Sequence, residues 1–499
     1  MAAVQSKGLR SVLKGTVAFF EDDFMRTLFP TQTNLLLVHS AADRIADYIL
    51  KICQEERNFL PQERVYAAKP DFHFRRTVKL DVVAEFFLYD LVYRNRHSFR
   101  DTETETRRSF GYRFKEGKLS SASLGYAAFR AAAREASEQY GFGASFDVSA
   151  YFNSIYHHDL VSWFNDGNRS ADDVKGFDRF LRQTNAGRSV DCLPQGIGPT
   201  KVIGSHFLNF VDFAGRLKSP LMLRFMDDVA FFADEEDVII QDFYQIQKLL
   251  GQRGLSVNPA KTRIGTIAQL DVRQQIDHIK KTLLRVRRLV SIDDYGEEHE
   301  QFKMEEHLLS KRQQRYLLEL LRNPEIDEED AELVLSLLRE KSDDVLDHVP
   351  IFLQRFPNLA KSIYLFCEHV QNKDRLAEQV LGFVKSAAVI TEYQLFWLGW
   401  IAQNSLSRTA NYGEILIRLY EHPFATLISR AKVLEIPEKR FGMNDLHEEH
   451  LRTGKSDWSA WASAVGLRAE SKANRNHLLG YFGNGSPLNG LIADCVKTL

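Results

Sequence analysis

Two adjacent carboxylates stand between short apolar runs in residues 223–232, which read L-R-F-M-D-D-V-A-F-F. The flanking runs are rich in β-forming residues, so we predict a β-hairpin with Asp227 and Asp228 at its tip. Neighbouring carboxylates at a tight turn repel each other and lose solvation, a cost that a bound divalent cation would offset. A solvated turn is the plainer alternative, because aspartate favours turns for its own hydrogen-bonding reasons.

A third carboxylate, Asp147, follows a short apolar run in residues 143–160, G-A-S-F-D-V-S-A-Y-F-N-S-I-Y-H-H-D-L. Two-metal phosphoryl transfer needs acidic oxygens from at least two chain segments, so that two ions about 3.5–4 Å apart can contact the attacking and leaving oxygens. Asp147, Asp227 and Asp228 could supply them. Between these segments, residues 193–212 read L-P-Q-G-I-G-P-T-K-V-I-G-S-H-F-L-N-F-V-D, which predicts a Gly/Pro loop running into an amphipathic helix.

The order of these segments resembles the palm of reverse transcriptases. F-D-V-S-A-Y-F, L-P-Q-G and F-M-D-D are similar to motifs A, B and C, and residues 250–265, L-G-Q-R-G-L-S-V-N-P-A-K-T-R-I-G, are similar to motif D. Each motif alone is weak, but four in order within about 120 residues are not well explained by chance. The resemblance implies that Asp147 and Asp227 hold catalytic Mg²⁺, with Mn²⁺ as an alternative, and that Asp228 stands beside them. The backbone carbonyl of Val148 would add an oxygen ligand.

The resemblance also assigns residues to the incoming nucleotide. Phe152 matches the steric-gate aromatic, whose ring would clash with a ribose 2′-hydroxyl and so favour deoxynucleotides. Gln195 and Gly196 match loop positions that support the nucleotide and the base opposite it. Lys261 matches the motif D lysine, a general acid towards the pyrophosphate leaving group. The alternative for Lys261 is an ordinary exposed lysine.

A basic region precedes the palm motifs. Residues 75–118 are dense in Arg and Lys and are interleaved with aromatic residues, a composition that suits phosphate neutralisation and base stacking. Fingers are expected there. Arg75, Arg76 and Lys79 are candidates for the triphosphate contact, because guanidinium and ammonium groups match phosphate oxygens. A solvated basic face is the alternative, and the sequence does not choose among the three residues.

Length and composition agree with a large enzyme without a membrane anchor. The 499 residues and 44% hydrophobic content can support two or three domains with substantial cores. The net charge of −2 results from a basic fingers region that is balanced by an acidic middle of the chain, so it does not exclude binding to nucleic acid. The four cysteines are dispersed, the N-terminus lacks a signal-peptide pattern, and no apolar run approaches the roughly 18 residues that span a bilayer. We therefore expect a cytoplasmic protein that does not insert into a membrane; the family resemblance described below implies that the cytoplasm is bacterial.

The second half of the chain has the pattern of short amphipathic helices. Periodic segments occupy residues 307–321, 331–338, 345–356, 359–370, 375–384, 393–402 and 412–419. Helices that cannot bury their faces alone suggest a stacked array similar to HEAT-type repeats. The expected fold is therefore an α/β (α+β) fingers and palm domain in residues 1–270, followed by an all-α helical-repeat domain in residues 271–499.

A palm of this type followed by a helical array resembles the abortive-infection reverse transcriptases, the AbiK-like group of bacterial phage-defence proteins, and most of all the member carried by P-two-like prophages. The resemblance implies template-independent polymerisation of dNTPs that starts from a protein hydroxyl. It implies a single-stranded DNA product attached covalently to the protein, and assembly into homo-oligomers. Tyr48 and Tyr66 are candidates for the priming hydroxyl, although a packed structural tyrosine is the plainer interpretation of each.

Two other functions stay open. The same carboxylates could serve a conventional RNA-templated reverse transcriptase of a retroelement or another defence system. Alternatively, the helical half could act as a HEPN-like ribonuclease toxin, whose motif is an Arg followed by four to six residues and a His. Arg440 and His447 in R-F-G-M-N-D-L-H satisfy this spacing, which also arises easily by chance.

Overall fold

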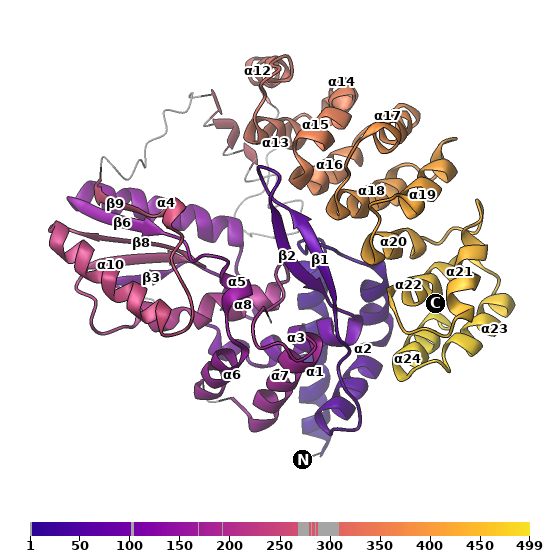
Figure 1. Cartoon of the computed structure of the whole chain (residues 1–499), viewed down its shortest axis with the longest axis horizontal. Helices are drawn as coiled ribbons and strands as arrows, with labels where there is room; N and C mark the ends of the chain where they lie inside the picture. The colour runs from indigo at the N-terminus through magenta and orange to yellow at the C-terminus, as the bar shows by residue number, and fades with distance from the viewer. Residues whose placement is uncertain are drawn as a thin grey trace. The chain divides into compact units, whose positions relative to one another are not determined.

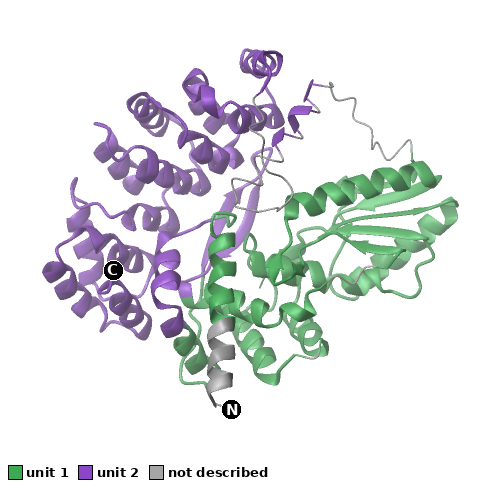
Figure 2. Ribbon diagram, turned by 180° about the vertical axis from the view of Figure 1, so that it is seen from behind, with its two compact units in different colours: residues 1–28, 46–62, 83–276 green, residues 29–45, 63–82, 277–499 purple. Residues whose placement is uncertain are grey.

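The chain folds into two compact units, each built from segments that are distant in the sequence (Figures 1 and 2). The computed structural model describes residues 2–100, 104–167, 169–191, 193–267, 279–280, 282–284, 286–287 and 309–499. Unit 1 consists of residues 1–28, 46–62 and 83–276, and unit 2 consists of residues 29–45, 63–82 and 277–499. The sequence suggested one boundary at residue 270, whereas in the structure two segments of the first half pack with the helical half.

A five-stranded mixed sheet with the order β3-β7-β8-β6-β9 is the scaffold of unit 1. Its strands are β3 (Arg107–Ser109), β6 (Phe142–Phe146), β7 (Leu221–Phe225), β8 (Asp228–Ala233) and β9 (Arg263–Thr266). β3 and β7 run parallel, and the other neighbouring strands are antiparallel. The antiparallel pair β7–β8 is the hairpin expected from the apolar runs around the two aspartates.

Helices cover both faces of this sheet (Figure 1). Phe129 of α4 (Ala122–Gln139) packs against Phe232 of β8 on one face. Phe243 of α10 (Glu236–Gly251) lies 5.9 Å from Phe146, measured between ring centroids, and Phe146 contacts Phe231. Because successive side chains of a strand point to opposite faces, Phe231 and Phe232 place α10 and α4 on opposite sides.

The rest of unit 1 is mainly helical. It contains α1 (Ala2–Phe24), the last turns of α2 (Gln32–Cys53), α3 (Val82–Arg94), α5 (Tyr151–Ser154), α6 (His157–Asp166), α7 (Ala171–Thr184), α8 (Gly198–Phe207), α9 (Asn209–Asp212) and the short strands β4 (Phe114–Lys115) and β5 (Lys118–Leu119). Aromatic rings join α1, α3 and α7: Phe20 lies 5.0 Å from Tyr89, and Phe87 stacks on Phe180 at 5.5 Å. Helix α3 is apolar over most of its surface, and accordingly all of its residues except Asp90, Tyr93 and Arg94 are buried.

Unit 2 is a helical array whose helices alternate between two rows. One row contains α13 (Glu328–Leu337), α16 (Ala360–Cys367), α18 (Glu392–Ser405), α20 (Leu427–Leu434), α22 (Trp458–Gly466) and α24 (Pro487–Val496), and each contacts the next. Outside them lie α15 (Val349–Arg355), α17 (Lys373–Ser386) and α19 (Tyr412–Glu421), and further along α21 (Met443–Arg452) and α23 (Lys472–Phe482). The unit also contains α12 (Lys311–Leu321) and α14 (Ser342–Val345). All seven periodic segments of the sequence contain a helix, although residues 307–308 of the first lie outside the described residues.

Two segments from the first half of the chain complete unit 2. The hairpin of β1 (Glu63–Ala68) and β2 (Phe74–Lys79) packs on α18. The first turns of α2 are held by Glu435, whose Oε2 accepts hydrogen bonds from the Thr33 backbone N–H at 2.9 Å and from its hydroxyl at 3.0 Å. Oε1 of the same carboxylate accepts a bond from Lys432 Nζ at 2.9 Å, and both charged side chains are fully buried. This buried pair fastens the N-terminal segment to the array.

Candidate functional site

Of the two adjacent aspartates, Asp227 lies in the turn of the β7–β8 hairpin and Asp228 begins β8. Phe225 pairs with Asp228, so that Met226 and Asp227 alone form the turn. Met226 has a φ of +57°, the left-handed conformation that two-residue hairpin turns require. The short turn therefore holds Asp227 and Asp228 at one end of the sheet.

Strand register brings the third aspartate to the same end of the sheet. Phe146 of β6 pairs with Val229 of β8, so the next residues outward, Asp147 and Asp228, are neighbours across the two strands. Asp147 is 9% exposed, and its Oδ1 has no hydrogen-bond partner among the described residues. An orphaned buried carboxylate oxygen is costly unless a cation or a proton compensates it.

The electrostatics of Asp228 reflect this crowding. Burial, and then the charges of Asp227 and Asp147, raise the pKa of Asp228 to about 6, against the opposing effects of Lys261 and Arg130. Such a shift marks a site where negative charge is concentrated and poorly solvated. The donor set, which consists of hard carboxylate oxygens, fits Mg²⁺.

No group of three or more His, Cys, Asp or Glu side chains is arranged to hold a metal ion by itself among the residues that the structure describes. This is compatible with Mg²⁺ chemistry, because Mg²⁺ is commonly bound by one or two protein carboxylates together with substrate phosphates. Val148, whose carbonyl is the predicted further ligand, is buried and pairs with Val257 in an isolated bridge.

Motif D reaches the aspartates through this bridge. The Asn258 backbone N–H donates to the Asp147 carbonyl at 2.8 Å, and a 3₁₀ turn over Pro259–Lys261 follows directly. Lys261 Nζ then lies 2.8 Å from Asp147 Oδ2, and this hydrogen bond raises the pKa of the lysine. Although the Lys261 side chain is 65% exposed, its charged end is located at the Asp147 carboxylate. Its role as a general acid stays a prediction.

The aromatic residue predicted to be the steric gate lies against the motif B helix. A side chain at Gly204 of α8 would come within 3.1 Å of the Phe152 ring. The neighbouring Tyr151 is buried, and its hydroxyl donates to the Gly204 carbonyl at 2.6 Å. α8 therefore packs against the Phe152 ring and limits where the ring can move.

The loop before α8 is shaped by a polar contact and a glycine. Gln195 Nε2 donates to Asn153 Oδ1 at 2.8 Å, which ties the loop to the segment that follows Asp147. Gly196 has a φ of +94°, and a Cβ there would lie 2.4 Å from Leu28. Both the conformation and the close approach require glycine at this position.

A buried ion pair behind the turn is a feature that sequence reasoning missed. Arg224 of β7 is 1% exposed and bonds Asp212 through Nε at 2.8 Å and through a second nitrogen at 2.5 Å. The same guanidinium donates to the carbonyls of Ser205 in α8 at 2.8 Å and of Met226 in the turn at 3.0 Å. The signal was an arginine in the otherwise apolar run L-M-L-R-F.

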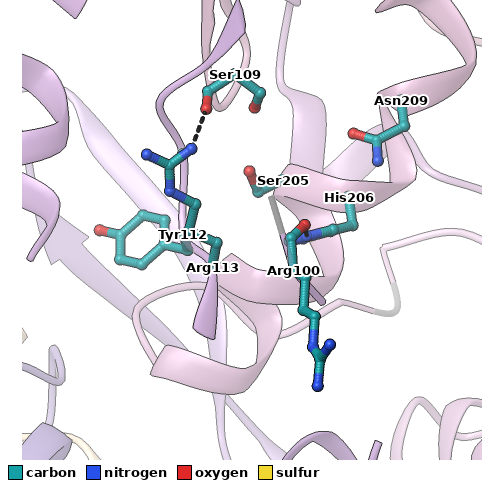
Figure 3. A pocket seen from close by; sticks show the side chains of 8 residues that line it. Arg100, Ser109, Tyr112, Arg113, Ser205, His206 and Asn209 are labelled. Atoms are coloured by element: carbon teal, nitrogen blue, oxygen red, sulfur yellow. Dashed lines mark hydrogen bonds between the residues drawn. The ribbon is translucent and has the colours of Figure 1, made fainter. Parts of the chain in front are cut away.

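A small polar pocket lies next to the same turn (Figure 3). Its lining consists of Arg100, Ser109, Gly111, Tyr112, Arg113, Ser205, His206 and Asn209. Arg113 donates to the Ser109 carbonyl at 2.9 Å, the bond drawn in Figure 3. A Cβ at Gly111 would lie 2.1 Å from Ser205 Oγ and 3.5 Å from the Met226 nitrogen, so this glycine lets the loop approach both α8 and the turn.

The three predicted triphosphate contacts lie on strand β2, in the other compact unit. Arg75 and Arg76 are exposed. Lys79 is 5% exposed, and its Nζ lies 5.6 Å from the ring centroid of Trp458 in α22. The structure groups these residues with the helical array, and their contact with a triphosphate stays a prediction.

The structure gives the HEPN-like pair no support. His447 is 1% exposed, its Nε2 contacts the Leu434 carbonyl at 2.8 Å, and burial lowers its pKa to about 4. Arg440 forms a 2.7 Å ion pair with Glu438. A buried histidine bonded to a backbone carbonyl packs the helical unit and is not placed to exchange protons with a substrate.

Comparison with known proteins identifies the part of the chain that holds the carboxylates. Residues 98–317 match the family described as reverse transcriptase (RNA-dependent DNA polymerase). The match includes Asp147, Asp227, Asp228 and Lys261, whereas residues 75–79 precede it. No match is found among the curated proteins.

Among solved structures, the chain is similar to telomerase from Candida albicans in complex with a fragment of telomeric RNA. The identity is 14%, the match covers 74% of this chain and 67% of that chain, and the TM-score is 0.30. A TM-score this low means that the two chains do not superpose as one fold, so the similarity supports no conclusion about function.

Proposed function

We propose that this chain, a nucleotidyltransferase of the RNA-directed DNA polymerase type by virtue of its reverse transcriptase domain, is a template-independent, protein-primed DNA polymerase of a bacterial abortive-infection system. The observation that carries the polymerase part is the cluster of Asp147, Asp228 and Lys261, which three separate segments bring together. The proposed substrates are dNTPs, and the proposed product is single-stranded DNA. Template independence, priming and the defence role rest on the resemblance of the ordered motifs and on the helical second half.

Each residue of the site has its own role in the proposed reaction. Asp147, Asp227 and Asp228 would hold Mg²⁺, which supplies charge neutralisation and activation of the attacking hydroxyl when it is bound. In the transfer, the attacking hydroxyl releases its proton to solvent and its oxygen forms a bond to the α-phosphorus. The bond between this phosphorus and the oxygen that bridges it to the β-phosphorus breaks, and pyrophosphate leaves. Lys261 is placed to give its Nζ proton to the leaving pyrophosphate. Phe152 excludes a 2′-hydroxyl by steric clash.

The exposed fractions of the two candidate tyrosines distinguish between them as sources of the priming hydroxyl. Tyr48 is 8% exposed, and Arg57 lies over its ring at 4.3 Å from the centroid, an arrangement typical of a structural residue. Tyr66 of β1 is 43% exposed. Tyr66→Phe is therefore the first variant to examine, with Tyr48→Phe beside it, by counting the label that stays attached to the protein.

The deciding experiment incubates the purified protein with Mg²⁺ and each labelled dNTP in the absence of any added nucleic acid. Products are separated on a denaturing gel before and after protease treatment. An Asp227→Ala and Asp228→Ala double variant tests the site, and Asp234→Asn is the matched control, because Asp234 is an exposed acid that directly follows the opposite end of β8. We expect label on the wild type and on Asp234→Asn, a mobility change after proteolysis, and no label on the double variant.

The same experiment distinguishes the second candidate function. If label appears only after an RNA template and a primer are supplied, the chain is a conventional templated reverse transcriptase that uses the same carboxylates. Size-exclusion chromatography with light scattering tests the proposed homo-oligomer. Among the described residues no helix is both long and apolar enough to cross a membrane, and fractionation of cells tests the proposed cytoplasmic location.

A further inference from the structure

The N-terminus of helix α8 is capped by a carboxylate from outside the helix. Ile197 occupies the N-cap position and offers no side-chain acceptor, and Pro199 has no backbone N–H. The Gly198 N–H instead donates to Asp23 Oδ2, from the end of α1, at 2.5 Å. A carboxylate at a helix N-terminus is also favoured by the helix dipole.

Asp23 is itself held in one orientation. Its Oδ2 accepts a second hydrogen bond, from the Tyr89 hydroxyl of α3, at 2.6 Å. Asp23 is 3% exposed and Tyr89 is fully buried. Burial and the charge of Asp23 raise the pKa of the Tyr89 hydroxyl, so it stays a hydrogen donor at every working pH.

Two glycines of L-P-Q-G-I-G make this contact sterically feasible. A Cβ at Gly198 would lie 2.9 Å from Asp23 Oδ2, and a Cβ at Gly196 would lie 2.4 Å from Leu28. Any side chain at either position would push the loop away from residues 23–28. The sequence of this loop therefore fits a surface formed by the end of α1 and the residues after it.

α8 connects this surface to the nucleotide site. Gln195 and Gly196 precede its first turn, and Gly204 lies against the Phe152 ring. Ser205 at its other end accepts a bond from Arg224, which also holds the turn of the aspartates. A shift of the N-terminus of α8 would therefore change the nucleotide loop and the packing of α8 against the Phe152 ring.

We propose that Asp23, oriented by Tyr89, is a positioning residue for nucleotide binding and sugar discrimination: it fixes the N-terminus of α8 and thereby the loop of Gln195 and Gly196. This inference rests on the proposed function, because it takes dNTPs as substrates. Asp23 does not contact the reacting atoms and acts through α8.

The test uses Asp23→Asn in the full-length protein, with Asp242→Asn as the matched control. Asp242 is 2% exposed and likewise accepts backbone N–H bonds, from Lys218 at 3.0 Å and Ser219 at 2.7 Å, but it lies in α10 and caps a different segment. Both variants should lose thermal stability. We expect Asp23→Asn alone to raise the KM for dNTPs about tenfold and to lower the preference for dNTPs over rNTPs to a similar degree, because a neutral acceptor bonds a backbone N–H more weakly than a carboxylate does.

Hydrogen exchange of the amides of residues 196–198, 200 and 201 gives a readout that needs no activity. Exchange should accelerate there in Asp23→Asn and stay unchanged in Asp242→Asn. If Asp23→Asn does not fold, Tyr89→Phe, which removes one bond to the carboxylate, should show a smaller change of the same kind. A folded Asp23→Asn with wild-type KM and sugar preference would overturn the proposal, as would equal effects in the control. If the wild type incorporates no nucleotide, the proposed function fails, whereas exchange and equilibrium binding of a labelled dNTP still decide the role of Asp23.

Discussion

Replacing Asp228 with asparagine should stabilise the metal-free protein at neutral pH while it abolishes nucleotide transfer. Asparagine matches the shape of the protonated side chain but removes the negative charge that crowds Asp147 and Asp227. The neighbouring charges and burial raise the pKa of Asp228 from its ordinary value of 3.8 to about 6. Between these values the folded protein binds more protons than the unfolded chain, so its stability falls as the pH rises through this window.

The size of the effect follows from the pKa. The rise of the Asp228 pKa from 3.8 to about 6 corresponds to a loss of about 3 kcal/mol in the free energy of unfolding at neutral pH, at ~1.4 kcal/mol per pKa unit. Because Asp228 is partly exposed, we expect about 1.5–2 kcal/mol after solvent screening. For a unit of this size that is roughly 3–8 °C in Tm.

The assay is thermal unfolding in a chelator at pH 4, 5, 6 and 7.5, with Asp234→Asn as the control. The Tm of Asp228→Asn should exceed that of the wild type at pH 7.5, and the two should converge at pH 4, where the wild-type carboxyl is protonated. Asp234→Asn should follow the wild type at every pH. A Tm difference that does not vary with pH, or a variant less stable than the wild type at pH 7.5, would refute the electrostatic reasoning.

Three further predictions follow from other contacts. Lys261→Ala should lower kcat about 100-fold with little change in KM if the lysine is the general acid, measured by single-turnover kinetics; an unchanged kcat would assign it to holding Asp147. Phe152→Val should increase rNTP incorporation relative to dNTP incorporation, measured by competition, and an unchanged ratio would exclude a steric gate at this position. Glu435→Ala should lower the free energy of unfolding of unit 2 by about 3–5 kcal/mol in urea, because it leaves the Lys432 ammonium buried without its carboxylate. The control is Glu448→Ala, which removes an exposed ion pair with Arg452 and should lower this free energy by less than about 1 kcal/mol.

The sequence by itself determined the carboxylates, the hairpin and the helical second half. These features depend on local patterns: two aspartates between β-forming runs, and apolar residues at helical spacing. The resemblance to motif D also selected Lys261, and the structure places its Nζ 2.8 Å from Asp147. Residues 98–317, which contain the four motif-like segments, match the family described as reverse transcriptase (RNA-dependent DNA polymerase).

Only the tertiary structure decided which residues from distant segments become buried partners. Arg224 and Asp212 form a buried pair because their strand and helix pack together, and residues 29–45 join the helical unit, where Glu435 holds the start of α2. Asp23 lies 175 positions from the glycine whose N–H it accepts. Strand register, side-chain packing and desolvation select such partners, and all three depend on contacts between segments that are distant in the sequence. A short stretch of sequence does not contain both members of such a contact.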